Sequence, residues 1–142
     1  MLVNLTQELI ADLLPQLKEI DKNTIGEHWG EKNFYFQADL KWQLSSVVIE
    51  NNLVHGFLIA SKKEHWAHIH RMAVHKDLRG KGYGRILIEA LVQKVIRSNL
   101  QGISLKVDPS NEAAIFFYKK NGFFVAGNEK KNILMQKETS HV

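Results

Sequence analysis

The sequence predicts a single α/β domain, because strand patterns and helix patterns follow one another without a linker, repeat or low-complexity segment. Two apolar runs flank Asn51-Asn52, which is typical of a β-hairpin. A strand-like run at 66–75 leads through three glycines into a helical pattern. With 142 residues, 44% of them hydrophobic, the chain can bury a sizeable core, and we expect residues 1–142 to form one domain.

The expected elements follow in chain order. Apolar residues at helical spacing predict a helix over 9–20, which Pro15 should kink or divide. Region 26–40 has no clean period and is expected to hold a helix and a loop. Asn51-Asn52 tolerates positive φ and should join strands at 47–49 and 54–59. The remaining prediction is a strand at 66–75, a helix at 82–97, a strand at 103–107, a helix at 110–120, and strands at 123–126 and 133–136.

The turn around Gly80, Gly82 and Gly84 is the most informative part of the chain. Glycines let the backbone approach an anion, and the first amides of the following helix point at it unpaired. Arg79, Lys81 and Arg85 add positive charge at the same place. The spacing matches neither the dinucleotide fingerprint G-x-G-x-x-G nor the nucleotide loop G-x-x-x-x-G-K-[ST]. The turn therefore predicts a site for a phosphate-bearing ligand of another kind.

Composition excludes several function classes. The formal net charge of +4 is modest, and the basic residues are scattered among 15 acidic ones, unlike the basic stripe of a nucleic-acid-binding protein. The chain has no cysteine, which excludes disulfides and a thiol nucleophile. It shows neither a signal-peptide pattern nor an apolar run near the roughly 20 residues of a membrane span. We expect a cytoplasmic protein that binds neither nucleic acid nor membranes.

Two motifs carry a resemblance to a known family. Arg79-x-x-Gly82-x-Gly84 follows a strand, and Asn111-x-x-Ala114-x-x-x-Tyr118 precedes Gly-Phe at 122–123. Together, and in this order, they resemble the GCN5-related N-acetyltransferase (GNAT) family from about residue 47 to the C-terminus. The resemblance implies a mixed, mostly antiparallel sheet with a splayed pair of central strands, flanked by helices. It also implies acetyl-CoA as co-substrate, with its pyrophosphate on the glycine turn.

The resemblance also implies which residues contact coenzyme A. Backbone groups of Met72 and Val74 would pair with the pantetheine arm, and the amide of Met72 or its neighbour would stabilise the developing oxyanion. Asn111 would contact the arm or fix the splayed strand, or else it merely begins a helix. The implied cofactor-binding residues are Met72, Ala73, Val74, Arg79, Gly80, Lys81, Gly82, Tyr83, Gly84, Arg85, Asn111 and Tyr118.

Tyr118 stands where the family places its general acid. A phenol with a pKa near ~10 is protonated at neutral pH and can donate to the leaving thiolate. Its alternative role is packing beside the neighbouring phenylalanines. No cysteine is available for an acetyl-enzyme, so direct transfer in a ternary complex is expected.

His68 and His70 are the candidate general bases. Strand alternation predicts that they share one face with Met72, and an imidazole pKa near ~6.5 suits removal of a proton from an amine. This segment resembles the paired-histidine strand of the arylalkylamine N-acetyltransferases. Two alternatives remain: a metal site completed by His65 or His75, although no metal is expected, or half-exposed residues without chemistry.

The acceptor is left open by the sequence. Ribosomal-protein N-terminal acetyltransferases resemble the chain around Asn111 and Tyr118 but carry a glutamate base where Lys106 stands here. Lys106 would face solvent or an anionic group of the substrate. A small-molecule amine is the favoured acceptor. The alternatives are a protein N-terminus or lysine, a non-catalytic acyl-CoA sensor, and, more remotely, nucleic-acid binding. The family resemblance allows a monomer or a homodimer.

Overall fold

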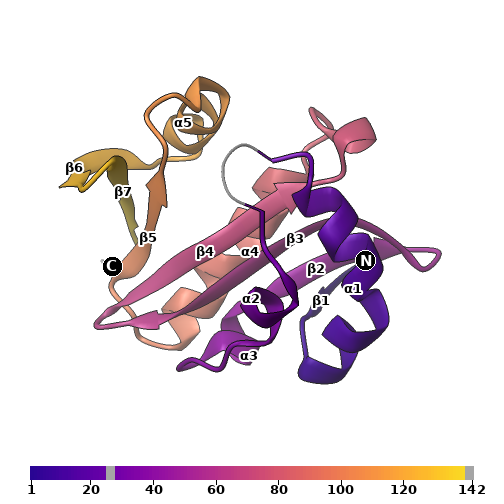
Figure 1. Cartoon of the computed structure of the whole chain (residues 1–142). Coiled ribbons are helices and arrows are strands. Elements are labelled where there is room, and N and C mark those ends of the chain that lie inside the picture. Colours follow the sequence, from indigo (N-terminus) through magenta and orange to yellow (C-terminus); the bar gives the residue numbers. More distant parts are fainter. Residues whose placement is uncertain (25–27, 140–142) are drawn as a thin grey trace.

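The computed structural model describes residues 1–24 and 28–139, and their strands form one seven-stranded sheet in the order β1-β2-β3-β4-β5-β7-β6 (Figure 1). Neighbouring strands pair antiparallel, except β4 and β5, which are parallel. The predicted mixed, mostly antiparallel sheet is confirmed. The strands are β1 Leu2–Asn4, β2 Ser46–Glu50, β3 Leu53–Lys63, β4 Trp66–Val74, β5 Gly102–Val107, β6 Phe124–Glu129 and β7 Asn132–Glu138.

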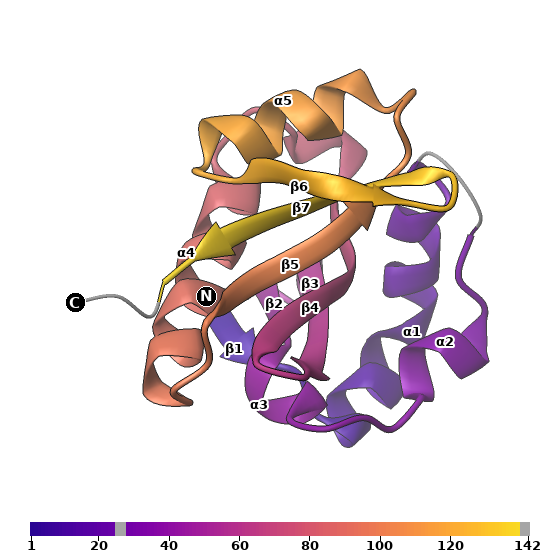
Figure 2. The ribbon, with the colours of Figure 1, turned by 90° about the vertical axis from the view of Figure 1, so that its left-hand side faces the viewer.

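Helices cover both faces of this sheet and create two cores. Figure 2 shows α1 and α2 on one side and α4 on the other. The α1-side core contains the apolar stripe of α1 together with Phe34, Phe57 and Ala73. The α4-side core contains the apolar stripe of α4 together with Leu58 and Tyr118. The helices are α1 Gln7–Asp21, α2 Glu31–Tyr35, α3 Lys41–Leu44, α4 Tyr83–Arg97 and α5 Glu112–Lys120, with a short 3₁₀ turn, η1, at Lys76–Leu78.

The N-terminal helix is longer and less interrupted than the sequence predicts. The Thr6 side chain caps α1 by accepting from the Leu9 amide at 3.0 Å. Pro15 lies inside the helix without dividing it, so of the two predicted outcomes, a kink or a division, the division is wrong. Pro15 is exposed, so the carbonyl that it leaves without a helical donor can be solvated, while the buried stripe holds the helix on the sheet.

The N-terminal half also contains elements that the sequence does not predict. Strand β1 is only three residues long and pairs with β2. In region 26–40, residues 28–40 contain α2 and a loop as expected, and Gly26 and Glu27 lie outside the described residues. The hairpin prediction is confirmed, because Asn51 and Asn52 join β2 to β3 with φ of 52° and 63°.

The two central strands separate, as the resemblance implies. Pairing between β4 and β5 runs only from Trp66–Gly102 to Ile69–Leu105, although β4 continues to Val74. Figure 1 shows the strands diverging beyond this point. A register shift against β3 lies at the same level, where Ile59 pairs with Arg71 and Ala60 with Ile69. The splay leaves the β5-facing edge of the last residues of β4 without a strand partner.

Candidate active site

The glycine turn has the conformation that an anion cradle needs. Gly80 and Gly82 have φ of +79° and +91°, and a Cβ at either would meet no heavy atom within 4 Å beyond its chain neighbours. Gly82 begins α4, and the first helical hydrogen bond runs from the Ile86 amide to the Gly82 carbonyl, so the amides of 83–85 have no partner within the helix. Lys81 and Arg85 are exposed beside them. These residues fit a pyrophosphate group.

Two residues of the same motif have structural partners. A Cβ at Gly84 would lie 2.9 Å from the Phe117 ring, so this glycine lets α5 approach α4 closely. The Arg79 guanidinium donates to the carbonyl of Asn23 at 2.9 Å and, through Nε, to that of Val74 at 3.4 Å. Arg79 thus joins the end of α1 to the end of β4. Contacts of Gly84 and Arg79 with coenzyme A remain predictions.

Met72 lies beyond the splay, but its side chain does not share a face with the histidines. Met72 pairs with Leu58 and packs against the α4-side core. His70 and Arg71 both reach the α1 side, where His70 meets the Phe36 ring and Arg71 binds Asp21. The register shift places two consecutive side chains on one face, so the simple alternation predicted for His68, His70 and Met72 is wrong.

Tyr118 is buried in the α4-side core. It is 8% exposed, and its ring contacts those of Phe117 and Phe123, each with a centroid separation of 5.3 Å. Burial raises the pKa of its hydroxyl to about 12, so it carries its proton throughout the neutral range. Tyr118 can therefore serve both roles, since its ring packs in the core while its hydroxyl keeps a proton that it can donate.

Asn111 begins α5. Its side-chain oxygen accepts from the Ala114 amide at 3.1 Å, which is the helix-start alternative of the sequence analysis. A contact with the pantetheine arm remains a prediction.

His68 and His70 come together on the α1 side of β4, with ring centroids 5.2 Å apart. Their partners come from neighbouring strands and could not be predicted from the local sequence: His68 Nδ1 lies 2.9 Å from Ser104 Oγ on β5, and His70 Nε2 lies 2.6 Å from Ser61 Oγ on β3. Because Tyr118 and Met72 lie on the α4 side, the candidate acid and the candidate bases occupy opposite faces at the splay.

The metal alternative finds no support in this arrangement. His65 is exposed in the β3–β4 turn, and His75 caps η1 by accepting from the Asp77 amide at 3.1 Å. Among residues 1–24 and 28–139, no group of three His, Cys, Asp or Glu side chains is placed to hold a metal ion. The same part of the chain has no helix that is long and apolar enough to cross a membrane.

Comparison with known proteins identifies the fold and chemistry. Residues 14–123 match the family model of the acetyltransferase (GNAT) family. The chain belongs to the GNAT family. This acetyltransferase uses acetyl-CoA as co-substrate to acetylate an amine. Bound acetyl-CoA supplies the acetyl group as a thioester, and the glycine turn and the unpaired edge of β4 are the parts of the chain that fit it.

Several relatives acetylate proteins. The acetyltransferase is 27% identical over 121 residues to the ribosomal protein bS18-alanine N-acetyltransferase of Escherichia coli K12, covering 85% of this chain and 81% of the relative. A peptidyl-lysine N-acetyltransferase of the same strain is 33% identical over 75 residues, which are 53% of this chain and 45% of the relative. The crystal structure of the S18-alanine enzyme from Escherichia coli matches with a TM-score of 0.81 at 24% identity, covering 100% and 95% of the two chains.

The histidines of this GNAT protein are much weaker bases than free imidazole. Burial, then the neighbouring His70, Lys63 and Lys106, lower the pKa of His68 to about 4. Burial, then Lys41 and Lys63, lower that of His70 to about 4. Both rings are therefore neutral at pH 7 and able to accept a proton, but only weakly.

Lys106 lies beside this cluster in an ion pair. Its Nζ is 3.1 Å from Glu129 on β6, and this partner lowers the pKa of the glutamate. The anionic partner of Lys106 is thus within the chain. Glu129 is a carboxylate close to the histidines, and its place in the site could not be predicted from the sequence because β6 is remote from β4 along the chain.

Two buried charges, Asp21 and Lys41, hold residues 29–36 on the side of the sheet that carries the histidines. Asp21 accepts from Arg71 Nε at 2.5 Å and from the Trp29 amide at 2.6 Å. Lys41, which is fully buried, donates to the carbonyls of Phe34 and Phe36, both at 2.6 Å. The Phe36 ring in turn lies 5.1 Å from His70. Nothing in the local sequence marks Asp21 or Lys41, because their partners are distant along the chain or backbone groups.

Proposed function

We propose that this GNAT protein transfers the acetyl group directly to an α-amino group, the N-terminal amine of a peptide or protein. The proposal rests on the position of His68 and His70, which are in ring contact on the α1 side of β4 and near Lys63, where burial and the lysine lower the pKa of both to about 4. A base this weak gives little driving force for deprotonating an alkylammonium ion. The acceptor then has to supply its own neutral fraction.

The two classes of protein amine differ strongly in that fraction. An α-amine with a pKa near ~7.8 is about one-third neutral at pH 7.5, whereas a lysine or alkylamine with a pKa near ~10.4 is about 0.1% neutral. The difference is roughly 300-fold. The lysines around the histidines would also oppose binding of an acceptor in its ammonium form, so an amine that is largely neutral in solution is favoured. The sequence alone favours a small-molecule amine as acceptor, whereas the electrostatics of the folded chain favour an N-terminal amine.

The arrangement of the splay supports direct transfer. An amine that approaches from the α1 side would meet the histidines, while Tyr118 on the α4 side would donate its proton to the departing thiolate. The amide of Met72 or a neighbour on the unpaired edge would stabilise the oxyanion between them. One relative that aligns over most of the chain is named a ribosomal protein bS18-alanine N-acetyltransferase, and a peptidyl-lysine N-acetyltransferase aligns over about half of it.

The acceptor is tested with matched substrates. One peptide carries a free α-amine and no lysine, a second carries the same sequence with a blocked N-terminus and one lysine, and an arylalkylamine represents small molecules. We expect kcat/KM for the free α-amine to exceed both others at least tenfold at pH 7.5. Its kcat/KM should rise with pH up to about 8, the pKa of the acceptor, without an inflection near 6.5. Equal or faster acetylation of the lysine peptide or the arylalkylamine would contradict the proposal.

Substitution of the histidines tests their part in proton transfer. We expect His68→Gln and His70→Gln each to lower kcat/KM about tenfold, which is less than the loss typical for a general base because both imidazoles are weak bases, without moving the rise near pH 8. His65→Gln, an exposed histidine on the adjoining turn, serves as the matched control and should behave like wild type. Wild-type rates in both active-site variants would show that proton removal depends on other groups.

A further inference from the structure

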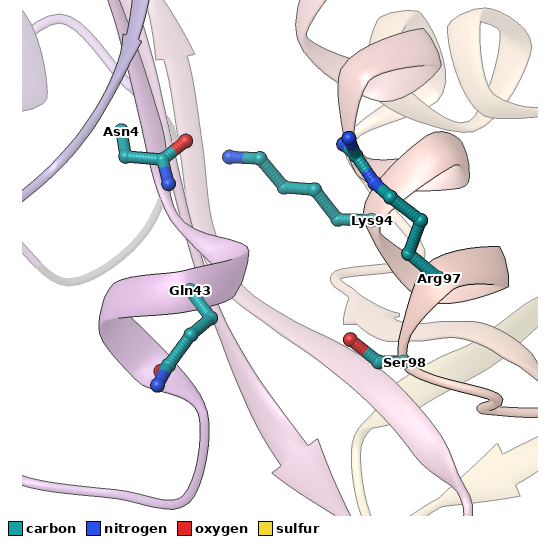
Figure 3. A pocket seen from close by; sticks show the side chains of 5 residues that line it. All are labelled: Asn4, Gln43, Lys94, Arg97 and Ser98. Atoms are coloured by element: carbon teal, nitrogen blue, oxygen red, sulfur yellow. The ribbon is translucent and has the colours of Figure 1, made fainter.

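A polar pocket lies at the far end of α4 from the glycine turn. Its volume is about 340 Å³, and it is lined by Asn4, Gln43, Lys94, Arg97 and Ser98. Figure 3 shows Lys94 and Arg97 extending from α4, with Asn4 and Gln43 across the pocket. Two cations and three uncharged polar side chains line it, and none of the lining residues is acidic. The proposed acetyl transfer uses none of these residues.

Lys94 is a buried charge that forms no ion pair with another described residue. It is 8% exposed, and its Nζ donates to the Ser45 carbonyl at 3.3 Å and to Ser46 Oγ. No carboxylate among residues 1–24 and 28–139 forms an ion pair with it. Burial and the nearby Arg97 lower its pKa to about 8, so it is still mostly charged at neutral pH. A buried charge is costly unless it is paired, and its two neutral acceptors do not balance it.

Arg97 adds a second cation with no partner in the described part of the chain. It is exposed, and no hydrogen bond or ion pair joins its side chain to another described residue. Guanidinium binds oxyanions through paired N–H donors, and Asn4, Gln43 and Ser98 offer further donors. The C-terminal turn of a helix also stabilises cations through the helix dipole. Lys94, however, donates to the Ser45 carbonyl and to Ser46 Oγ, and not to carbonyls of its own helix.

We propose that this pocket binds a small oxyanion of the phosphate type, held between Lys94 and Arg97. The volume leaves room for phosphate with several waters, or for the phosphoryl group of a small metabolite. The pocket is separate from the glycine turn. Lys94 and Arg97, which line the pocket, belong to the C-terminal end of α4, whereas the glycine turn precedes the N-terminal end of this helix. The existence of the site does not depend on the identity of the acetyl acceptor.

The test uses protein saturated with coenzyme A, so that the glycine turn is already filled. Inorganic phosphate is titrated against sodium chloride at matched ionic strength, and the unfolding midpoint is followed. Wild type should gain about 3 °C or more at saturating phosphate over chloride. Arg97→Gln should raise the apparent Kd at least tenfold, and Lys94→Met should remove the effect. Lys18→Gln, an exposed charge change on α1, should keep it.

Two results would overturn the proposal: equal midpoints in phosphate and chloride, or wild-type phosphate affinity in Arg97→Gln. If Lys94→Met does not fold, Arg97→Gln and Ser98→Ala decide the question, because both residues are on the pocket wall and neither is buried in a core.

Discussion

Tyr118→Phe is expected to lower kcat about 100-fold while leaving the affinity for coenzyme A close to that of wild type. The hydroxyl is the only part removed, and burial keeps its pKa at about 12, so in wild type it is a protonated donor at neutral pH. Without it, the thiolate of coenzyme A would leave without a proton donor. The measurement is kcat with saturating acetyl-CoA and acceptor, with the Kd for coenzyme A determined in parallel.

The ring contacts of Tyr118 provide the control for this variant. Phenylalanine retains the contacts with Phe117 and Phe123, so the free energy of unfolding should change by about 1 kcal/mol or less. Because the residue acts on the leaving group, the loss in kcat should be the same for acceptors whose amines differ in pKa. An unchanged kcat would remove Tyr118 from the mechanism, and a loss that varies with acceptor pKa would assign it to the amine side.

Asp21→Asn is expected to lower the free energy of unfolding by about 3 kcal/mol. The Asp21 side chain is 1% exposed and binds Arg71, whose side chain is 16% exposed. Removing one member of a buried ion pair leaves the other charge in a poor solvent, which typically costs 3–5 kcal/mol. The variant amide also cannot accept from both Arg71 and the Trp29 amide in the same way as the carboxylate. Denaturant unfolding measures the loss.

The double variant Asp21→Asn, Arg71→Met separates the ion pair from the shape of the site. It should regain part of the lost stability, because the charge left by the first substitution is also removed. Both variants should raise KM for the acceptor more than KM for acetyl-CoA, since Asp21 binds the backbone of Trp29 in the region leading to α2 and α3. A change in unfolding free energy below about 1 kcal/mol in Asp21→Asn would show that the pair does not hold this region.

Much of the fold could be predicted because its signals are local. Asn51-Asn52 between two apolar runs predicts the hairpin, and the glycines before an apolar helical stripe predict the loop that opens α4. The motif ending in Tyr118 and Gly-Phe likewise predicts α5 and the strand after it. Turn residues and periodicity depend on neighbours in the chain, so they can be read without knowing the tertiary structure.

Other features depend on contacts that are remote in sequence. The register shift opposite Ile59 and Ala60 sends His70 and Arg71 to one face, and alternation along β4 alone predicted otherwise. Pro15 looked like a break in the helix, yet the packing of the buried stripe of α1 against β3 outweighs one lost hydrogen bond. Strand β1 is too short to show a period and exists through its pairing with β2.

The motifs of the sequence are enough to predict the family, the co-substrate and the candidate residues His68, His70 and Tyr118. The environments of these residues depend on the folded chain. Desolvation and nearby lysines, which come from separate strands and helices, turn ordinary imidazoles into weak bases, and burial among aromatic rings holds the proton on Tyr118. A pKa depends on the charges and solvent around a group, and these are assembled when the chain folds.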